Sequence, residues 1–164
     1  MNLPTRQELA EILRQHRVSR RLVRDIRYVP EEITHPDARD FLVVSTKSGN
    51  EGVLLYQEYV LVLTLKKRTA NKGGRIEAII CDICATWQRG TNSAVVSLKK
   101  DDKTTVSYLV CGDLDCSLHV RDKTSESKLS RAHLRENITP DARIERLRAN
   151  IKRICTIITT PKNA

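Results

Sequence analysis

Four cysteines in two short pairs constrain this chain more than any other feature. Two residues separate Cys81 from Cys84, and four separate Cys111 from Cys116. Each spacing can place two thiolates on one side of a tight turn, and the interval between the pairs is long enough for a β-hairpin. The pattern predicts a closed tetrahedral site for one structural zinc ion, which would hold the fold together and perform no chemistry.

Disulfides or ordinary buried thiols are the alternative interpretation of these cysteines. The chain opens with MNLPTRQELAE, which is charged and has no apolar signal-peptide core, so we expect a cytoplasmic protein whose thiols stay reduced. His119 is the only histidine close enough in sequence to compete as a ligand, and its position favours a helix-face residue. No apolar run approaches the roughly 20 residues that span a bilayer, so no membrane association is expected.

The residues between and after the cysteine pairs predict how the site is built. Segments 94–98 and 104–110 are rich in β-branched residues and flank the polar turn 100–103, which indicates an antiparallel hairpin. The segment that ends at Cys116 then leads into a short helix over residues 117–121. A cysteine knuckle, a hairpin and a helix that bears the last ligand form the treble-clef arrangement.

The remaining pattern predicts an α+β fold with an antiparallel sheet. Strands are expected over residues 41–45, 53–56 and 59–65, and short helices from residues 5 and 19. A breaker-rich connection at residues 30–37 suggests a boundary between an N-terminal helical segment, 1–36, and the zinc-binding body, 37–164. A long C-terminal helix begins at Thr139, and its apolar stripe is expected to face the core. Cys155 lies beside that stripe and is interpreted as a small buried residue, not a fifth ligand.

Charge indicates an acidic partner. The formal net charge of +9 and the pI of about 9.6 fit nucleic acid, an acidic protein face or an anionic surface. Residues 66–75 contain two glycines, no acid and five basic residues, and are interpreted as an exposed basic loop close to the metal site, either merely solvated or in contact with a partner. These five are Lys66, Lys67, Arg68, Lys72 and Arg75.

The segments around the cysteines resemble a known family. The run from Cys111 to Arg121, CGDLDCSLHVR, together with CDICATW at residues 81–87, is similar to the FusB-type treble-clef proteins that bind elongation factor G. The resemblance covers residues 37–160 and implies that Cys81, Cys84, Cys111 and Cys116 hold the zinc. Members that confer resistance help the factor leave ribosomes stalled by fusidic acid, and they carry a larger helical bundle ahead of the zinc domain.

The resemblance implies a non-catalytic adaptor that binds elongation factor G and modulates its action or release on the ribosome. We expect a monomer whose partner contacts combine the five basic residues above with Arg121, Lys123 and, as an aromatic anchor, Trp87. A zinc-containing module that binds ribosomal RNA is the alternative, although the chain offers few aromatic rings for stacking bases. An enzyme is not expected, because no catalytic triad or nucleotide-binding glycine motif appears.

Overall fold

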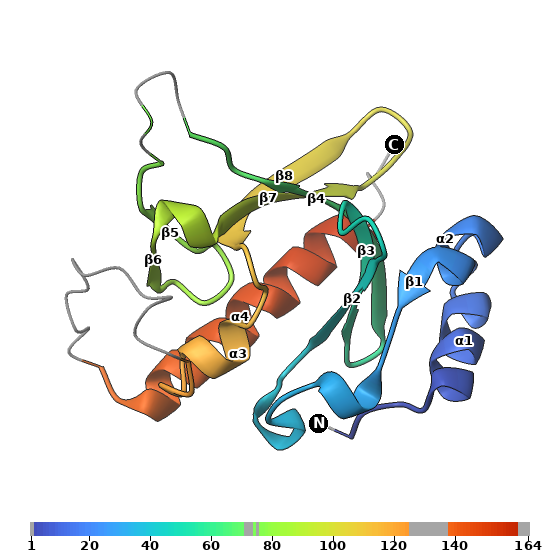
Figure 1. Ribbon diagram of the computed structural model, residues 1–164, viewed down its shortest axis with the longest axis horizontal. Helices are drawn as coiled ribbons and strands as arrows, with labels where there is room; N and C mark the ends of the chain where they lie inside the picture. The colour runs from blue at the N-terminus through green and yellow to red at the C-terminus, as the bar shows by residue number, and fades with distance from the viewer. Residues whose placement is uncertain (1, 71–73, 75, 125–137, 161–164) are drawn as a thin grey trace.

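A six-stranded antiparallel sheet organises the protein (Figure 1). The computed structural model describes residues 2–70, 74, 76–124 and 138–160. The strands occur in the order β1-β2-β3-β4-β7-β8. Their bounds are β1 (Ile26–Arg27), β2 (Leu42–Thr46), β3 (Glu51–Tyr56), β4 (Tyr59–Lys67), β7 (Ser93–Lys99) and β8 (Thr105–Cys111). The predicted α+β class with an antiparallel sheet, a treble clef and a long C-terminal helix is confirmed.

Strand β3 separates two hydrophobic cores, because successive side chains of a strand point to opposite faces of the sheet. Val53 and Leu55 join the core beneath the N-terminal helices. Leu54 and Tyr56 join the core beneath the C-terminal helix and the cysteine cluster. Val53 to Tyr56 are all buried, so this strand is covered on both faces.

Two short helices cover the first of these faces. The helix α1 (Arg6–Gln15) begins with the predicted capping box, in which the Thr5 hydroxyl accepts from the backbone N–H of Glu8 and the Glu8 carboxylate accepts from the N–H of Thr5. The second helix, α2 (Arg20–Asp25), ends earlier than its apolar pattern suggests, since Ile26 begins β1 and pairs with Thr46. The two helices therefore pack on the sheet as a cap, hereafter the N-terminal cap.

The connection from the cap to the sheet contains two single turns of 3-10 helix, η1 (Pro30–Glu32) and η2 (Pro36–Ala38). Both begin at proline, whose fixed φ suits the first position of a helical turn. These turns account for the breaker-rich stretch in the sequence.

The long helix α4 (Pro140–Thr159) lies on the other side of β2 and β3 from α1 (Figure 1). Its first turn is capped by the Thr139 side chain, which accepts from the N–H of Ala142. Leu147, Ile151 and Ile154 are almost fully buried in the second core, as the stripe predicted. No helix in the described part of the chain is long and apolar enough to cross a membrane.

The chain between β4 and β7 forms a small second sheet of β5 (Ile79–Ile80) and β6 (Trp87–Gln88), followed by the turn η3 (Gly90–Asn92). Gly90 permits a close crossing of two chain segments, because a Cβ atom there would lie 2.1 Å from the backbone oxygen of Ile76. The last short helix, α3 (Cys116–His119), follows β8. Strand β4 extends to Lys67, so the prediction of a loop from residue 66 is wrong for its first two residues.

Candidate metal centre

The four cysteines come from three different elements and meet in one place. Cys81 and Cys84 belong to the turn between β5 and β6, Cys111 is the last residue of β8, and Cys116 is the first residue of α3. Cys111 pairs with Ser93 at the end of the β7–β8 hairpin. This end lies beside the β5–β6 turn, where the backbone N–H of Asp82 donates to the carbonyl of Leu109. The predicted order of knuckle, hairpin and helix is therefore present.

The sulfur atoms have the separations that a tetrahedral zinc site needs. The Sγ–Sγ distances are 3.7 Å for Cys81–Cys116, 3.5 Å for Cys84–Cys111 and 3.6 Å for Cys111–Cys116. Zinc–sulfur bonds of about 2.3 Å arranged as a tetrahedron give sulfur–sulfur edges of about 3.8 Å. All four residues are buried and unbridged, and their sulfurs lie within 4.8 Å of one another. The donor set fits one structural zinc ion, with the four cysteines as its ligands.

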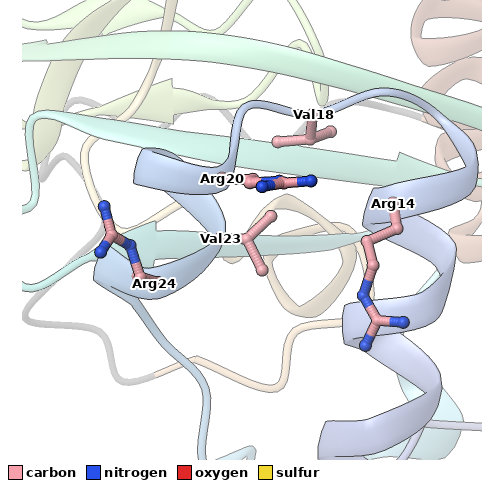
Figure 2. Close-up of a pocket in the computed structure, with 5 residues that line it drawn as sticks. All are labelled: Arg14, Val18, Arg20, Val23 and Arg24. Carbon is pink, nitrogen blue, oxygen red and sulfur yellow. The ribbon is translucent and has the colours of Figure 1, made fainter.

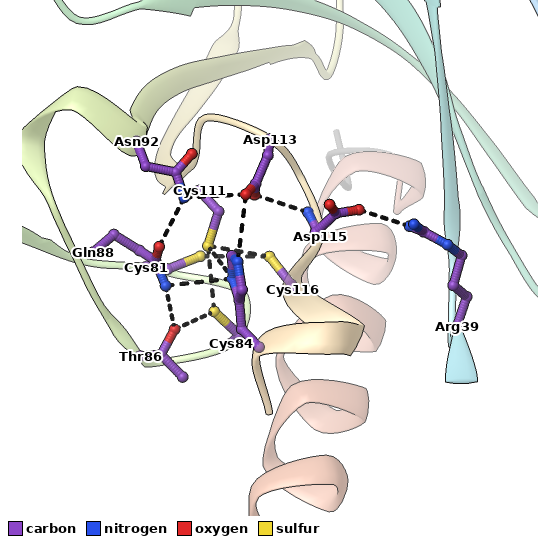
Figure 3. Close-up of polar contacts among 11 residues, drawn as sticks. Arg39, Cys81, Cys84, Thr86, Gln88, Asn92, Cys111, Asp113, Asp115 and Cys116 are labelled. Carbon is purple, nitrogen blue, oxygen red and sulfur yellow. Dashed lines mark hydrogen bonds and ion pairs between the residues drawn. The ribbon is translucent and has the colours of Figure 1, made fainter. Parts of the chain in front are cut away.

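A chain of buried and partly buried polar side chains supports this tetrad (Figure 3). The Thr86 hydroxyl lies 2.9 Å from the Cys84 sulfur and accepts a hydrogen bond of 2.8 Å from the Gln88 amide, so its own proton is free to point at the sulfur. The Gln88 carbonyl in turn accepts from the Asn92 amide at 2.9 Å. Such groups fix the orientation of a metal ligand and place donors beside the negative charge of the thiolates.

His119 closes the other side of the site. Its Nδ1 lies 3.2 Å from the Cys111 sulfur, and its Nε2 lies 3.4 Å from a carboxylate oxygen of Asp113. His119 is the last residue of α3, so it lies on a helix as expected, but its ring is buried inside the cluster, where it contacts a zinc ligand and an acid. The geometry makes His119 a partner of the Cys111 thiolate within a complete four-sulfur set.

The thiols of the tetrad do not ionise equally easily, because the pKa of Cys84 is lowered whereas the pKa values of Cys111 and Cys116 are raised. Burial raises the pKa of the Cys84 thiol, but hydrogen bonds from Cys111, Cys116, Cys81 and His119 together hold that pKa well below its ordinary value. At Cys111 burial raises the pKa well above the ordinary value. Burial lowers the pKa of His119, yet its interactions with Asp113 and Cys84 raise it to about 9. Zinc binding requires deprotonated thiols, and the ion supplies the positive charge that allows all four to ionise together.

Side chains of helix α4 form hydrogen bonds with the backbone of the Cys81–Cys84 turn. The Asn150 side-chain amide donates to the backbone carbonyl of Ile83 at 3.1 Å, and the Arg146 guanidinium donates to the carbonyl of Cys84 at 3.5 Å. The C-terminal helix thus satisfies backbone groups within the Cys81–Cys84 turn. The short zinc-bearing segment is tied by hydrogen bonds to the longest element of the fold.

A buried ion cluster joins the site to the rest of the molecule. Asp40, which is 6 % exposed in its side chain, accepts two hydrogen bonds from Arg121, at 2.6 and 3.1 Å, and one from Arg148 at 2.9 Å. Burial raises the pKa of Asp40, but the two guanidiniums outweigh that effect and lower it. A second ion pair of 2.9 Å, between Arg39 and Asp115, reaches from the same connection to the start of α3.

The basic residues predicted as partner contacts occupy different surroundings. Lys66 and Lys67 are exposed at the end of β4, and Lys67 pairs with Ala94 beside the strand ends that carry the site. Lys123 is also exposed, and Trp87 is half-buried in β6. Lys72 and Arg75 lie outside the described residues.

Arg68 and Arg121 have partners within the chain. The Arg68 guanidinium donates to the carbonyl of Glu77 at 3.1 Å, which links Glu77 to the residue that follows β4. Arg121 belongs to the Asp40 cluster and its side chain is only 16 % exposed. The charge pattern drew attention to both residues but gave no sign of these internal partners, which come from 9 and 81 positions away.

A family model for the FBP C-terminal treble-clef zinc-finger matches residues 31–158. The chain belongs to this family. The match spans the whole second core, all four zinc ligands and almost all of α4. No curated protein and no solved structure matches the chain. Members of this family carry a zinc finger, which agrees with the sulfur geometry and with the predicted cofactor.

Proposed function

We propose that this protein is a non-catalytic adaptor of the cytoplasm that binds elongation factor G and modulates its action or release on the ribosome. The family assignment over residues 31–158 is the observation that carries the proposal, because the FusB-type proteins that the chain resembles bind that factor. The zinc site serves this role by making a small treble clef rigid. A preformed surface loses less conformational entropy on binding than a mobile one.

Charge complementarity supports the same partner. The chain has a formal net charge of +9, and elongation factors as a class are acidic, so opposite fields would accelerate encounter. Lys66 and Lys67 are the best candidates for the contact, since both are exposed at the zinc-bearing end of the sheet and neither has an ion-pair partner among the described residues. Trp87, which is half-buried, and Lys123, which is exposed, are further candidates for contact with the factor.

Calorimetric titration of the zinc-loaded protein into purified elongation factor G tests the proposal. We expect a one-to-one complex of micromolar or tighter affinity. Lys66→Glu with Lys67→Glu should weaken the complex about 10-fold or more, because two attractive charges become repulsive. Lys100→Glu with Lys103→Glu is the matched control, since it makes the same change in charge at the opposite end of the β7–β8 hairpin.

Two other outcomes of this titration would argue against the proposed contact or the proposed partner. An equal loss of affinity in both double variants would show that only the total charge matters and would move the specific contact elsewhere. The absence of heat and of any complex with the wild-type protein would overturn the adaptor proposal and leave the zinc-finger fold without this partner.

A further inference from the structure

A pocket in the N-terminal cap lies apart from the zinc site and is lined mainly by arginine (Figure 2). Its lining consists of Arg14, Val18, Arg20, Val23 and Arg24, from α1, α2 and the turn between them, and it is a hollow of about 500 Å³ that is open to solvent. Arg14 and Arg24 flank Val23, with the Arg20 guanidinium beside it. The surface of the pocket is mostly apolar, and three exposed arginines place their charges around it. None of the residues that line it is acidic.

Two of the three arginines at this pocket have no ion-pair partner among the described residues, and the third has a solvent-exposed one. Arg21 and Arg27, also from the α2–β1 segment, form ion pairs with Glu51 and Glu32. Arg20 and Arg24 have no ion-pair partner in the described ranges 2–70, 74, 76–124 and 138–160. Arg14 pairs with Glu11 at 2.6 Å, but both side chains are more than half exposed, and such a pair contributes only about 0 to 1 kcal/mol. An incoming anion can therefore displace Glu11 or share Arg14 with it.

The size and the chemistry of the pocket favour a nucleotide over a simple anion. Small-molecule sites typically enclose about 300 to 1,000 Å³, and a phosphate alone would fill little of this space. A guanidinium can bind a phosphate with two parallel hydrogen bonds, and it can also stack on the flat face of a base. The valine floor offers apolar contact to a base, which an acidic peptide side chain would not use.

We propose that the arginine pocket between α1 and α2 binds a nucleotide of single-stranded RNA, with the guanidiniums on its phosphates and its base over Val18 and Val23. Arginine here takes the stacking role that aromatic rings perform in most single-strand readers, and the chain is poor in such rings. This site is independent of the proposed contact with elongation factor G, because it lies in the cap at the other face of the sheet. A protein with both contacts could hold RNA and the factor together.

Fluorescence anisotropy of the full, zinc-loaded chain with a labelled, short single-stranded oligoribonucleotide tests the proposal. Arg20→Gln with Arg24→Gln should weaken binding about 10-fold. The double variant should also lower the slope of log affinity against log salt by about 1.4, since each phosphate contact on a single strand contributes about 0.7. Lys152→Gln with Arg153→Gln is the matched control, because it removes the same charge from the exposed face of α4 and should change affinity less than 2-fold.

Three results would overturn the proposal: no binding of RNA by the wild-type protein, an equal loss in both double variants, and equal binding of a polyglutamate peptide at the same site. Thermal unfolding and zinc content show whether each variant folds, and Arg24→Glu alone provides a second variant if the double one does not. Titration of Arg20→Gln/Arg24→Gln with elongation factor G separates the two proposals. Unchanged affinity for the factor is expected whether or not RNA binds, so a loss there would assign the pocket to the protein interface instead.

Discussion

The two faces of the central sheet are stabilised in different ways. On one face, α1 and α2 bury leucine and valine side chains against β2 and β3, and an ion pair between Arg21 and Glu51 lies at the surface of this contact. On the other face, the short elements β5, β6 and α3 contain two to four residues each, too few to stabilise themselves by apolar burial. Four thiolates, a buried polar network and hydrogen bonds from α4 hold that region instead.

The two faces show two ways in which a protein of this size can hold its segments in place. Apolar packing needs regular elements that present a continuous stripe or face, as α4 and β3 do. Metal ligation needs only four donors in the right place, so it can fix turns that have little secondary structure. Loss of apolar volume should therefore destabilise the N-terminal cap, and loss of a ligand should destabilise the zinc region.

Loss of a zinc ligand should have the largest effect. Cys84→Ala removes one of four thiolates from a site whose metal contributes on the order of 10 kcal/mol of apparent folding free energy, so the treble clef should unfold and zinc should be lost. Elemental analysis by mass spectrometry should give about one zinc per wild-type chain and almost none in the variant. Cys155→Ala is the control, because Cys155 is equally buried but stands in the α4 core, where its loss should cost about 1 kcal/mol and leave zinc in place. A variant at Cys84 that keeps a full zinc content would contradict the four-sulfur site.

Leu13→Ala should destabilise the protein through the N-terminal cap and leave the zinc site intact. Leu13 is 1 % exposed between α1 and the sheet, so truncation should lower the free energy of unfolding by about 3 kcal/mol. Zinc content should stay at the wild-type value, since Leu13 and the four cysteines belong to different hydrophobic cores. Denaturant unfolding and elemental analysis on the same sample check both statements. A coupled loss of zinc would show that the two faces unfold as one cooperative unit.

Asp40→Asn should give the smallest of the three effects, about 2 kcal/mol, because Arg121 is largely buried while Arg148 is half exposed and can turn to water. The sign of its pH dependence follows from the lowered pKa of Asp40. Its stabilising effect is complete above the ordinary carboxyl pKa of about 4 and is lost as the pH falls through the lower folded value. The stability difference between wild type and variant should therefore shrink in acid, and a constant difference across that range would argue against the ion cluster.

The sequence was sufficient for features that depend on neighbours along the chain. The two cysteine spacings, the capping box at Thr5 and the apolar stripe of the C-terminal helix each depend on short intervals along the chain, so they predicted the zinc ligands and the helices α1 and α4. The short resemblance around Cys111–Cys116 gave the family, which the match over residues 31–158 confirms. β1 escaped prediction because its two residues take their strand character from pairing with β2.

Tertiary structure alone decided which polar groups meet. Arg148 reaches Asp40 across 108 positions of sequence, and Gln88 approaches His119 across 31. Such partners are set by how α3 and α4 pack against the sheet, and residue type or charge pattern carries no information about that packing. For the same reason the charge pattern could not indicate that Arg121 pairs with Asp40, or that Arg14, Arg20 and Arg24 line one pocket. Local chemistry along the chain determines the elements and the metal ligands, whereas contacts between distant elements exist only once the two cores have formed.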